Sequence, residues 1–168
     1  FVDDAGSQTN MTLVLQGFAE ASPQYLPMVG LLRCLDDGMS TRLHYELCDQ
    51  KGLAYSINAG VDALTDISLF EISGATAHHK VVALIEALAK ILASLRETPV
   101  TDAELDRIRT RYRYELLASF DDGSAMASWF GGTRLYADPP SLGSRLHAIE
   151  QLTAAQITAV AREVLQPH

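Results

Sequence analysis

Apolar and polar residues alternate along the first half of the chain. In residues 9–18 (TNMTLVLQGF), Leu13 and Leu15 share one face while Val14 and Phe18 share the other. Apolar residues on both faces are typical of a strand that lies inside a sheet. This stretch therefore predicts an interior strand.

Two later stretches predict a hairpin. Residues 53–61 (LAYSINAGV) and 67–75 (ISLFEISGA) are separated by a segment short enough to join an antiparallel pair. In the second stretch, Phe70 and Ile72 share one face, as they would in a half-buried strand.

Helical periodicity appears between the first strand and the hairpin. Ser22 is a candidate N-cap, Pro23 occupies the first helical position, and residues 36–38 (DDG) end the helix. The predicted inner stripe consists of Met28, Leu31, Leu32 and Leu35. A short amphipathic segment follows and leads into the hairpin.

Helices are predicted from residue 77 onward. Residues 77–96 form the first, and Thr101 with Glu104 forms a capping-box pattern before a second, which Gly123 interrupts. The expected inward-facing residues are Val81, Leu84, Ile85, Leu88, Leu92 and Leu95 in the first helix, and Leu105, Ile108, Tyr112 and Leu116 in the second.

The last third of the chain predicts shorter helices. Residues 124–137 form one that ends before Pro139, and a second capping-box pattern, Thr153 with Gln156, opens the last helix through Leu165. Strands followed by helices indicate an α+β fold, in which helices pack on one face of an antiparallel sheet. We expect a single domain over residues 1–168.

Composition and charge narrow the class of protein. A chain of 168 residues that is 48% hydrophobic can form a core of its own, and a net charge of −8 argues against nucleic acid and anionic membranes as partners. No apolar run approaches the roughly 20 residues of a membrane span. The sequence indicates a soluble protein without assigning a compartment. Its start at Phe1 suggests a fragment, a processed form or the ordered part of something longer.

The histidines do not form a metal-binding pattern. His147 is followed by Glu150, but Gln151 stands where a zincin-type motif needs its second histidine. His78 and His79 are adjacent and cannot both point at one metal from a regular helix. We therefore expect no zinc site in this chain.

Patterns for nucleophilic catalysis and phosphate binding are also absent from the sequence, which has no G-x-S-x-G, G-x-G-x-x-G or P-loop. Four arginines alternate between residues 107 and 113, which spreads them around a helix. We expect them to be solvated, with Arg111 and Glu115 forming an i,i+4 pair.

Residues 38–55 read GMSTRLHYELCDQKGLAY. This stretch resembles a segment of the pitrilysin/insulinase family of zinc metallopeptidases. That family includes the mitochondrial processing peptidase and the non-catalytic core subunits of the respiratory cytochrome complex. In the family's C-terminal homologous domain, a small-residue turn is followed by Ser-Arg-Leu. A short helix that contains a glutamate comes next and leads into (Lys/Arg)-Gly-Leu-Ala-Tyr. The matching residues here are Gly38-Met39-Ser40, Arg42-Leu43, Glu46 and Lys51-Gly52-Leu53-Ala54-Tyr55. The order of elements and the closing helix are also similar, so the resemblance covers nearly the whole chain and implies an insulinase-like two-layer sandwich.

The resemblance implies a partner domain without zinc. Active members hold zinc on an inverted His-x-x-Glu-His motif in the N-terminal homologous domain, and this chain lacks that motif. We therefore expect the chain to be inactive alone and to pair with a zinc-bearing homologous domain or subunit. If that partner is a separate chain, the pair would be a homo- or heterodimer. We also expect the chain to contact an unstructured peptide substrate.

The resemblance also implies two substrate-binding positions. In active members the partner domain contributes an arginine and, seven residues later, the tyrosine of Gly-Leu-Ala-Tyr. Tyr55 matches the tyrosine, whereas Cys48 stands at the arginine position. A thiol is a weak donor without charge and cannot replace a guanidinium.

Three explanations for Cys48 are open. The domain belongs to a peptidase that works without the arginine, or to a non-catalytic subunit that keeps the fold for assembly, or Arg42 substitutes. We favour a structural role for Arg42, so the partner-domain hypothesis stands first and the structural assembly subunit second. An unrelated α+β ligand-binding domain is third.

Overall fold

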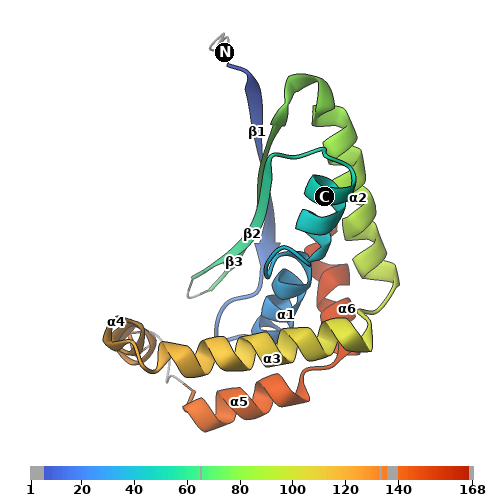
Figure 1. The fold of residues 1–168 in the computed structure, drawn as a ribbon. Coiled ribbons are helices and arrows are strands. Elements are labelled where there is room, and N and C mark those ends of the chain that lie inside the picture. Colours follow the sequence, from blue (N-terminus) through green and yellow to red (C-terminus); the bar gives the residue numbers. More distant parts are fainter. Residues whose placement is uncertain (1–5, 65, 133, 136–139, 167–168) are drawn as a thin grey trace.

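The computed structural model describes residues 6–64, 66–132, 134–135 and 140–166 (Figure 1). Its elements, in chain order, are β1 (Gln8–Gly17), α1 (Tyr25–Leu35), the π-helix η1 (His44–Gln50), β2 (Ser56–Ala63), β3 (Ser68–Ala77), the 3₁₀-helix η2 (His78–Lys80), α2 (Val81–Glu97), α3 (Asp102–Ser119), α4 (Gly123–Ala127), the π-helix η3 (Ser128–Gly132), α5 (Leu142–Gln151) and α6 (Ala154–Val164).

The three strands form one antiparallel sheet in the order β1-β3-β2. The predicted hairpin is confirmed as β2 and β3. The interior position predicted for residues 9–18 is not seen among the described residues, where β1 pairs with β3 alone and lies at an edge of the sheet. Val14, which made both faces look apolar, is 48% exposed on the face that the helices leave open.

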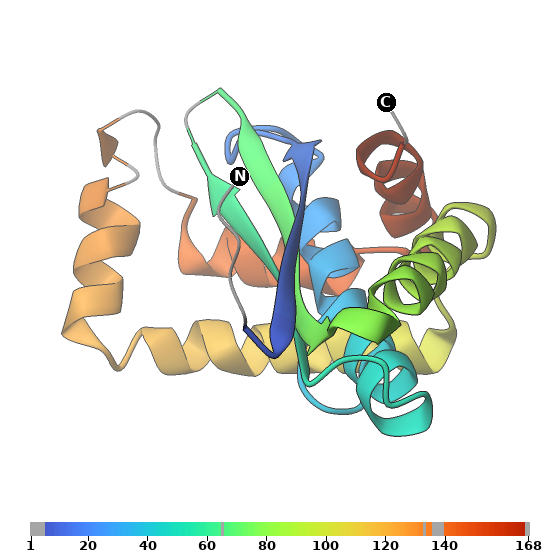
Figure 2. The ribbon, with the colours of Figure 1, turned by 90° about the horizontal axis from the view of Figure 1, so that it is seen from above.

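Three helices cover one face of the sheet (Figures 1 and 2). α1 packs against β2, α6 packs against β1, and α6 lies between α1 and α2. Phe70 and Ile72 point from β3 into the core beneath them and are fully buried. The three helices and the sheet form the predicted α+β architecture, with helices on one face of an antiparallel sheet. Among the described helices, none combines the length and apolarity needed to cross a lipid bilayer.

The first helix begins later than predicted. Gln24 is the N-cap of α1 and Pro27 lies in its first turn, so Ser22 is not the N-cap. The Ser22 hydroxyl instead bonds Gln24, and Tyr25 N donates to the Ser22 carbonyl, which makes a turn ahead of the helix. Most of the predicted stripe is fully buried, and Leu32 is half-buried.

The capping boxes are confirmed at the starts of α3 and α6, in each case with both reciprocal hydrogen bonds. α2 buries Leu84, Leu88 and Leu95 as expected, but Ile85 is 50% exposed. Residues 124–137 fold differently from the single helix predicted: α4 is short and passes into η3, and the end of this stretch lies outside the described residues.

Three of the four arginines of α3 contact other elements, although Arg111 and Arg113 also stay exposed as predicted. Arg111 pairs with Asp37 at 3.1 Å and Glu115 pairs with Arg33 at 2.7 Å, so the predicted pair between Arg111 and Glu115 is wrong. Arg109 donates two hydrogen bonds to the Leu152 carbonyl, which ties α3 to the end of α5. The two ion pairs join α3 to α1 and the turn after it, and the Arg109 bonds join α3 to α5, across one end of the sheet (Figure 1).

Candidate functional site

The segment that precedes β2 contains a π-helix. In η1 the N–H of Lys51 donates to the Glu46 carbonyl at 3.2 Å, five residues back, instead of four as in an α-helix. Gly52 then takes a φ of +55°, which favours glycine and turns the chain out of the helix. The sequence predicts a short amphipathic helix here; the wider winding of the π-helix is what the structure adds.

The backbone from Gly52 to Tyr55 is held from two sides. From η1, the Leu47 carbonyl accepts from the N–H groups of Leu53 and Ala54 at 2.7 and 3.2 Å. From β3, the Ala75 carbonyl accepts from Tyr55 N at 2.8 Å.

Two side chains add to these backbone bonds. Thr76 Oγ1 donates to the Leu53 carbonyl, and Lys80 Nζ donates to the Gly52 carbonyl at 2.8 Å. Thr76 is almost fully buried beneath the segment. The backbone before β2 is therefore fixed by bonds to η1, to β3 and to η2.

Tyr55 projects from this fixed backbone into solvent. Its side chain is 65% exposed, and it lies one residue before β2 begins. A tyrosine packed on the sheet would bury its ring and use its hydroxyl within the domain. Tyr55 instead leaves its ring and hydroxyl accessible from outside the domain.

Cys48 lies on η1 and belongs to the same hydrogen-bonded unit. Its carbonyl accepts from Gly52 N at 3.1 Å, while its side chain is half-buried against the edge of the core. Burial, with a smaller contribution from the Asp49 carboxylate, raises the pKa of the Cys48 thiol. The group is therefore a neutral thiol near neutral pH and lacks the charge of the arginine that the resemblance leads us to expect at this position.

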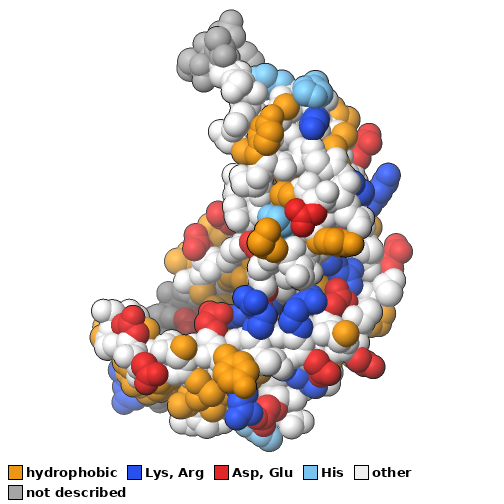
Figure 3. All heavy atoms as spheres, viewed as in Figure 1, with side chains coloured by type: hydrophobic (Ala, Val, Ile, Leu, Met, Phe, Trp, Pro, Cys, Tyr) orange, Lys and Arg blue, Asp and Glu red, His pale blue; other side chains and the backbone are white. Residues whose placement is uncertain are grey.

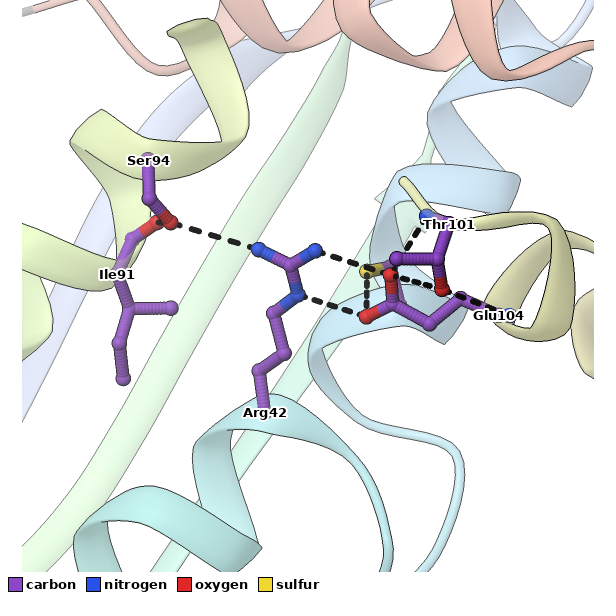
Figure 4. Close-up of polar contacts among 6 residues, drawn as sticks. Arg42, Ile91, Ser94, Thr101 and Glu104 are labelled. Atoms are coloured by element: carbon purple, nitrogen blue, oxygen red, sulfur yellow. Dashed lines mark hydrogen bonds and ion pairs between the residues drawn. The ribbon is translucent and has the colours of Figure 1, made fainter. Parts of the chain in front are cut away.

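Arg42 occupies a different environment from Tyr55, although both come from one segment. Figure 4 shows Arg42 between Ser94 of α2 and Glu104 of α3. Its Nε and Nη2 donate to the two carboxylate oxygens of Glu104 at 2.8 and 3.0 Å, and Nη1 reaches Ser94 Oγ at 3.4 Å. We call this group, with Thr101 and Cys34, the Arg42 cluster. Arg42 therefore joins the residues just before η1 to α2 and α3, which is the structural role expected for it. Its guanidinium donors are taken up by Glu104 and Ser94.

Charge and burial in the Arg42 cluster shift two pKa values. Burial disfavours the Glu104 carboxylate, but hydrogen bonds from Arg42 and Thr101 outweigh it and lower its pKa from 4.5 to about 2. Burial raises the pKa of the Cys34 thiol to about 12, and that thiol donates to Glu104 Oε1 at 3.7 Å. Glu104 is thus ionised and Cys34 protonated at neutral pH.

Within the described ranges, no three His, Cys, Asp or Glu side chains gather closely enough to hold a metal ion. His147 and Gln151 are both exposed on α5. His78 contacts Thr9 and the Gly6 carbonyl near the start of β1. His168 lies outside the described residues.

Sequence reasoning missed the two side chains that support the Gly52–Tyr55 backbone. Thr76 and Lys80 lie more than twenty residues away along the chain. The register of the hairpin could have indicated Thr76, because β2 and β3 pair Ser56 with Ala75 and so bring Thr76 next to the residues before Ser56. Lys80 lies in η2, just beyond the end of β3.

Comparisons with known proteins agree with this fold. The sequence profile described as "Peptidase M16 inactive domain" matches residues 1–112. An uncharacterized zinc protease of Mycobacterium tuberculosis is 30% identical over 132 residues, which are 78% of this chain and 30% of that protein. The zinc protease PqqE of Helicobacter pylori is 28% identical over 79% of this chain and 30% of its own length. The chain thus spans about 30% of the length of these relatives.

Solved structures share the fold at lower identity. A protease from Helicobacter pylori superposes with a TM-score of 0.90 at 23% identity, over 98% of this chain and 40% of that one. The inactive peptidase domain of a zinc protease from Bordetella parapertussis gives 0.81 at 17% identity, over 98% of this chain and 90% of that one. A chain of complex III from Candida albicans gives 0.80 at 16% identity, over 96% of this chain and 41% of that one.

Proposed function

Since the chain belongs to the peptidase M16 family, as an inactive domain of the zinc protease fold, we propose that it forms one wall of a peptide-enclosing chamber opposite a zinc-bearing domain. In this proposal Tyr55 binds the peptide near the scissile bond, and the zinc is held by the partner, on the same chain or another. The observation that carries it is the exposed Tyr55 side chain on a backbone fixed from both sides.

The shape of the molecule supports a wall. The face of the sheet away from α1, α2 and α6 is left open, and α3 carries α4 out past it, so that the outline is hollowed between them (Figures 1 and 3). Apart from Val14, the open face of β1 presents polar residues, among them Thr12, whose hydroxyl is 3.2 Å from that of Ser73 on β3. Such a surface can contact varied peptides without demanding one sequence.

The chemistry of Tyr55 suits a developing oxyanion. A phenol hydroxyl on a fixed backbone can donate to the oxygen that gains charge in the transition state, at little cost in reorganisation. Such a bond is stronger in the transition state than in the ground state, so it raises kcat more than it lowers KM. Cys48, as a neutral thiol, contributes no positive charge in this proposal.

The test is Tyr55→Phe in the assembled zinc protease, with turnover of an unstructured peptide as the readout. We expect kcat to fall by on the order of 10²-fold, with little change in melting temperature, since loss of one oxyanion donor has about this effect. Tyr114→Phe is the matched control, because Tyr114 is 67% exposed on α3. Full turnover by Tyr55→Phe would put the structural assembly subunit first, and a joint loss of stability and turnover would make Tyr55 a packing residue.

Cys48→Arg tests the departure from the family. Cys48 is only half-buried, so an arginine there can pack its stem on the core and extend its head into water. We expect the variant to fold with a similar melting temperature and to turn over peptide faster than the parent protein. An unfolded variant would show that Cys48 is a core position, outside the substrate-binding surface.

A further inference from the structure

The start of α2 goes against the local rules for a helix N-terminus. η2 runs directly into α2, so the helical run begins after Ala77 and Lys80 is its third residue. A positive charge is unfavourable there, because the free N–H groups of the first turn already carry partial positive charge. α2 has no acidic residue in its first turn, and among the described residues neither η2 nor α2 has a side-chain cap.

Other helices of the domain follow these rules. α3 and α6 carry Glu104 and Gln156 at the third helical position, each in a complete capping box. Lys80 stands at the corresponding position of the run that begins with η2. A lysine there weakens the start of the helix, so its presence calls for another role.

The Lys80 ammonium binds a different element. Nζ donates to the Gly52 carbonyl at 2.8 Å, 28 residues away along the chain. Gly52 lies just past the end of η1 with a φ of +55°, so its carbonyl needs a partner from outside that helix. A charged donor makes a stronger bond to this carbonyl than a neutral one would.

η2 is itself fixed, so Lys80 acts from a rigid base. His78 Nδ1 lies 2.7 Å from Thr9 Oγ1 on β1, and its Nε2 contacts the Gly6 carbonyl. Lys80 is half-buried, which limits the freedom of its long side chain. A chain of contacts therefore runs from β1 through η2 to Gly52, three residues before Tyr55.

We propose that Lys80 is a positioning residue for Tyr55: its ammonium holds the Gly52 carbonyl, and with it the backbone that directs the Tyr55 hydroxyl towards the peptide. This inference rests on the proposed function of Tyr55. An oxyanion donor has to be in place before charge develops, because a donor that must reorganise loses much of its effect. The contact also explains why a lysine stands at the start of α2, since local rules are most often broken at functional sites.

Lys80→Met in the assembled zinc protease tests the proposal, because methionine keeps much of the length of the side chain but removes the donor. We expect kcat to fall about tenfold with little change in KM, a smaller loss than removal of the Tyr55 hydroxyl itself causes. The melting temperature should stay unchanged, because the lost hydrogen bond is offset by relief of the charge at the helix start. Amide hydrogen exchange at Leu53 and Tyr55 should become faster.

Two further variants serve as controls. Lys80→Arg keeps a charged donor within reach of the Gly52 carbonyl and should recover most of the lost turnover. Lys90→Met removes an exposed lysine from the middle of α2 and should leave kcat and amide exchange at Tyr55 as in the parent protein. A fall in both melting temperature and kcat that Lys80→Arg does not recover would overturn the proposal and make Lys80 a packing residue.

A double-mutant cycle shows whether Lys80 acts through Tyr55. In a Tyr55→Phe background, Lys80→Met should lower kcat no further, because the hydroxyl that it positions is gone. A full additional loss in that background would overturn the proposal, since Lys80 would then act elsewhere. If Tyr55→Phe lowers kcat but Lys80→Met does not, this inference fails and the proposed function stands. If Tyr55→Phe keeps full turnover, the proposed function fails and this inference with it.

Discussion

Arg42 and Tyr55 come from one short segment, yet the structure uses them in opposite ways. Arg42 points inward, and its donors are taken up by Glu104 and Ser94. Tyr55 has its backbone bound within the domain and its side chain outside it. A sequence pattern shared with a family can thus contain residues that hold the domain together, such as Arg42, beside residues whose side chains remain available to a ligand, such as Tyr55. The predictions below test that division.

The largest expected effect is the removal of Glu104. Glu104→Ala leaves Arg42 without its ion-pair partner and removes the capping box of α3, so we expect a loss of about 3 kcal/mol in the free energy of unfolding. Asp102→Ala, an exposed carboxylate in the first turn of α3, is the control and should cost well under 1 kcal/mol. Chemical denaturation of both variants is the measurement. Equal losses would mean that the Arg42 cluster is not structural.

Acid should weaken the Arg42 cluster. The pKa of Glu104 is lowered on folding from 4.5 to about 2, so its stabilising contribution is complete above about pH 4.5 and is lost as the pH falls towards 2. Glu104→Gln should remove this part of the pH dependence. Melting temperatures of both proteins between pH 7 and pH 2 provide the test, and parallel curves would contradict the assigned ion pair.

A smaller effect is expected beneath Tyr55. Thr76→Val keeps the shape of the side chain but removes the hydroxyl that donates to the Leu53 carbonyl, which should cost about 1 kcal/mol. Thr12→Val, on the exposed face of β1, should change stability much less. Faster amide exchange at Tyr55 in the Thr76 variant would show that the hydroxyl holds this backbone; unchanged exchange would assign the support to the backbone bonds alone.

The smallest perturbation is thiol labelling of the native chain. Cys34 is fully buried with a pKa near 12, whereas Cys48 is half-buried at the edge of the core. Because the thiolate is the reactive form, iodoacetamide should modify Cys48 first and reach Cys34 only after unfolding. Peptide mass mapping after timed quenching distinguishes the two. Equal labelling would show that the cluster around Cys34 opens readily.

Features set by neighbours in sequence could be predicted. The capping boxes of α3 and α6 need only residues three apart, and the hairpin needs only two alternating stretches and a short connection. The buried faces of α1 and β3 also follow from local periodicity. Tyr55 and Cys48 were found through the resemblance, and the structure adds how each is held.

Features set by distant neighbours could not be predicted. Whether residues 9–18 form an edge or an interior strand depends on strand order, which no local pattern contains. Arg111 pairs with Asp37, although Glu115 is nearer in sequence, because α1 brings Asp37 alongside α3. The π-helix η1 differs from an α-helix by one residue in its hydrogen-bond partner, a difference too small for hydrophobic periodicity to register.

The shared carboxylate of Glu104 also has a consequence for the order of folding. One oxygen, Oε2, accepts from Thr101 N and Thr101 Oγ1, three residues away, and from Arg42, sixty-two residues away. Contacts three residues apart close quickly, whereas long loops close late. We therefore expect α3 to form first, starting from its own N-terminus. The Glu104 carboxylate on α3 would then bind Arg42, so that the segment carrying Tyr55 docks onto a helix already formed.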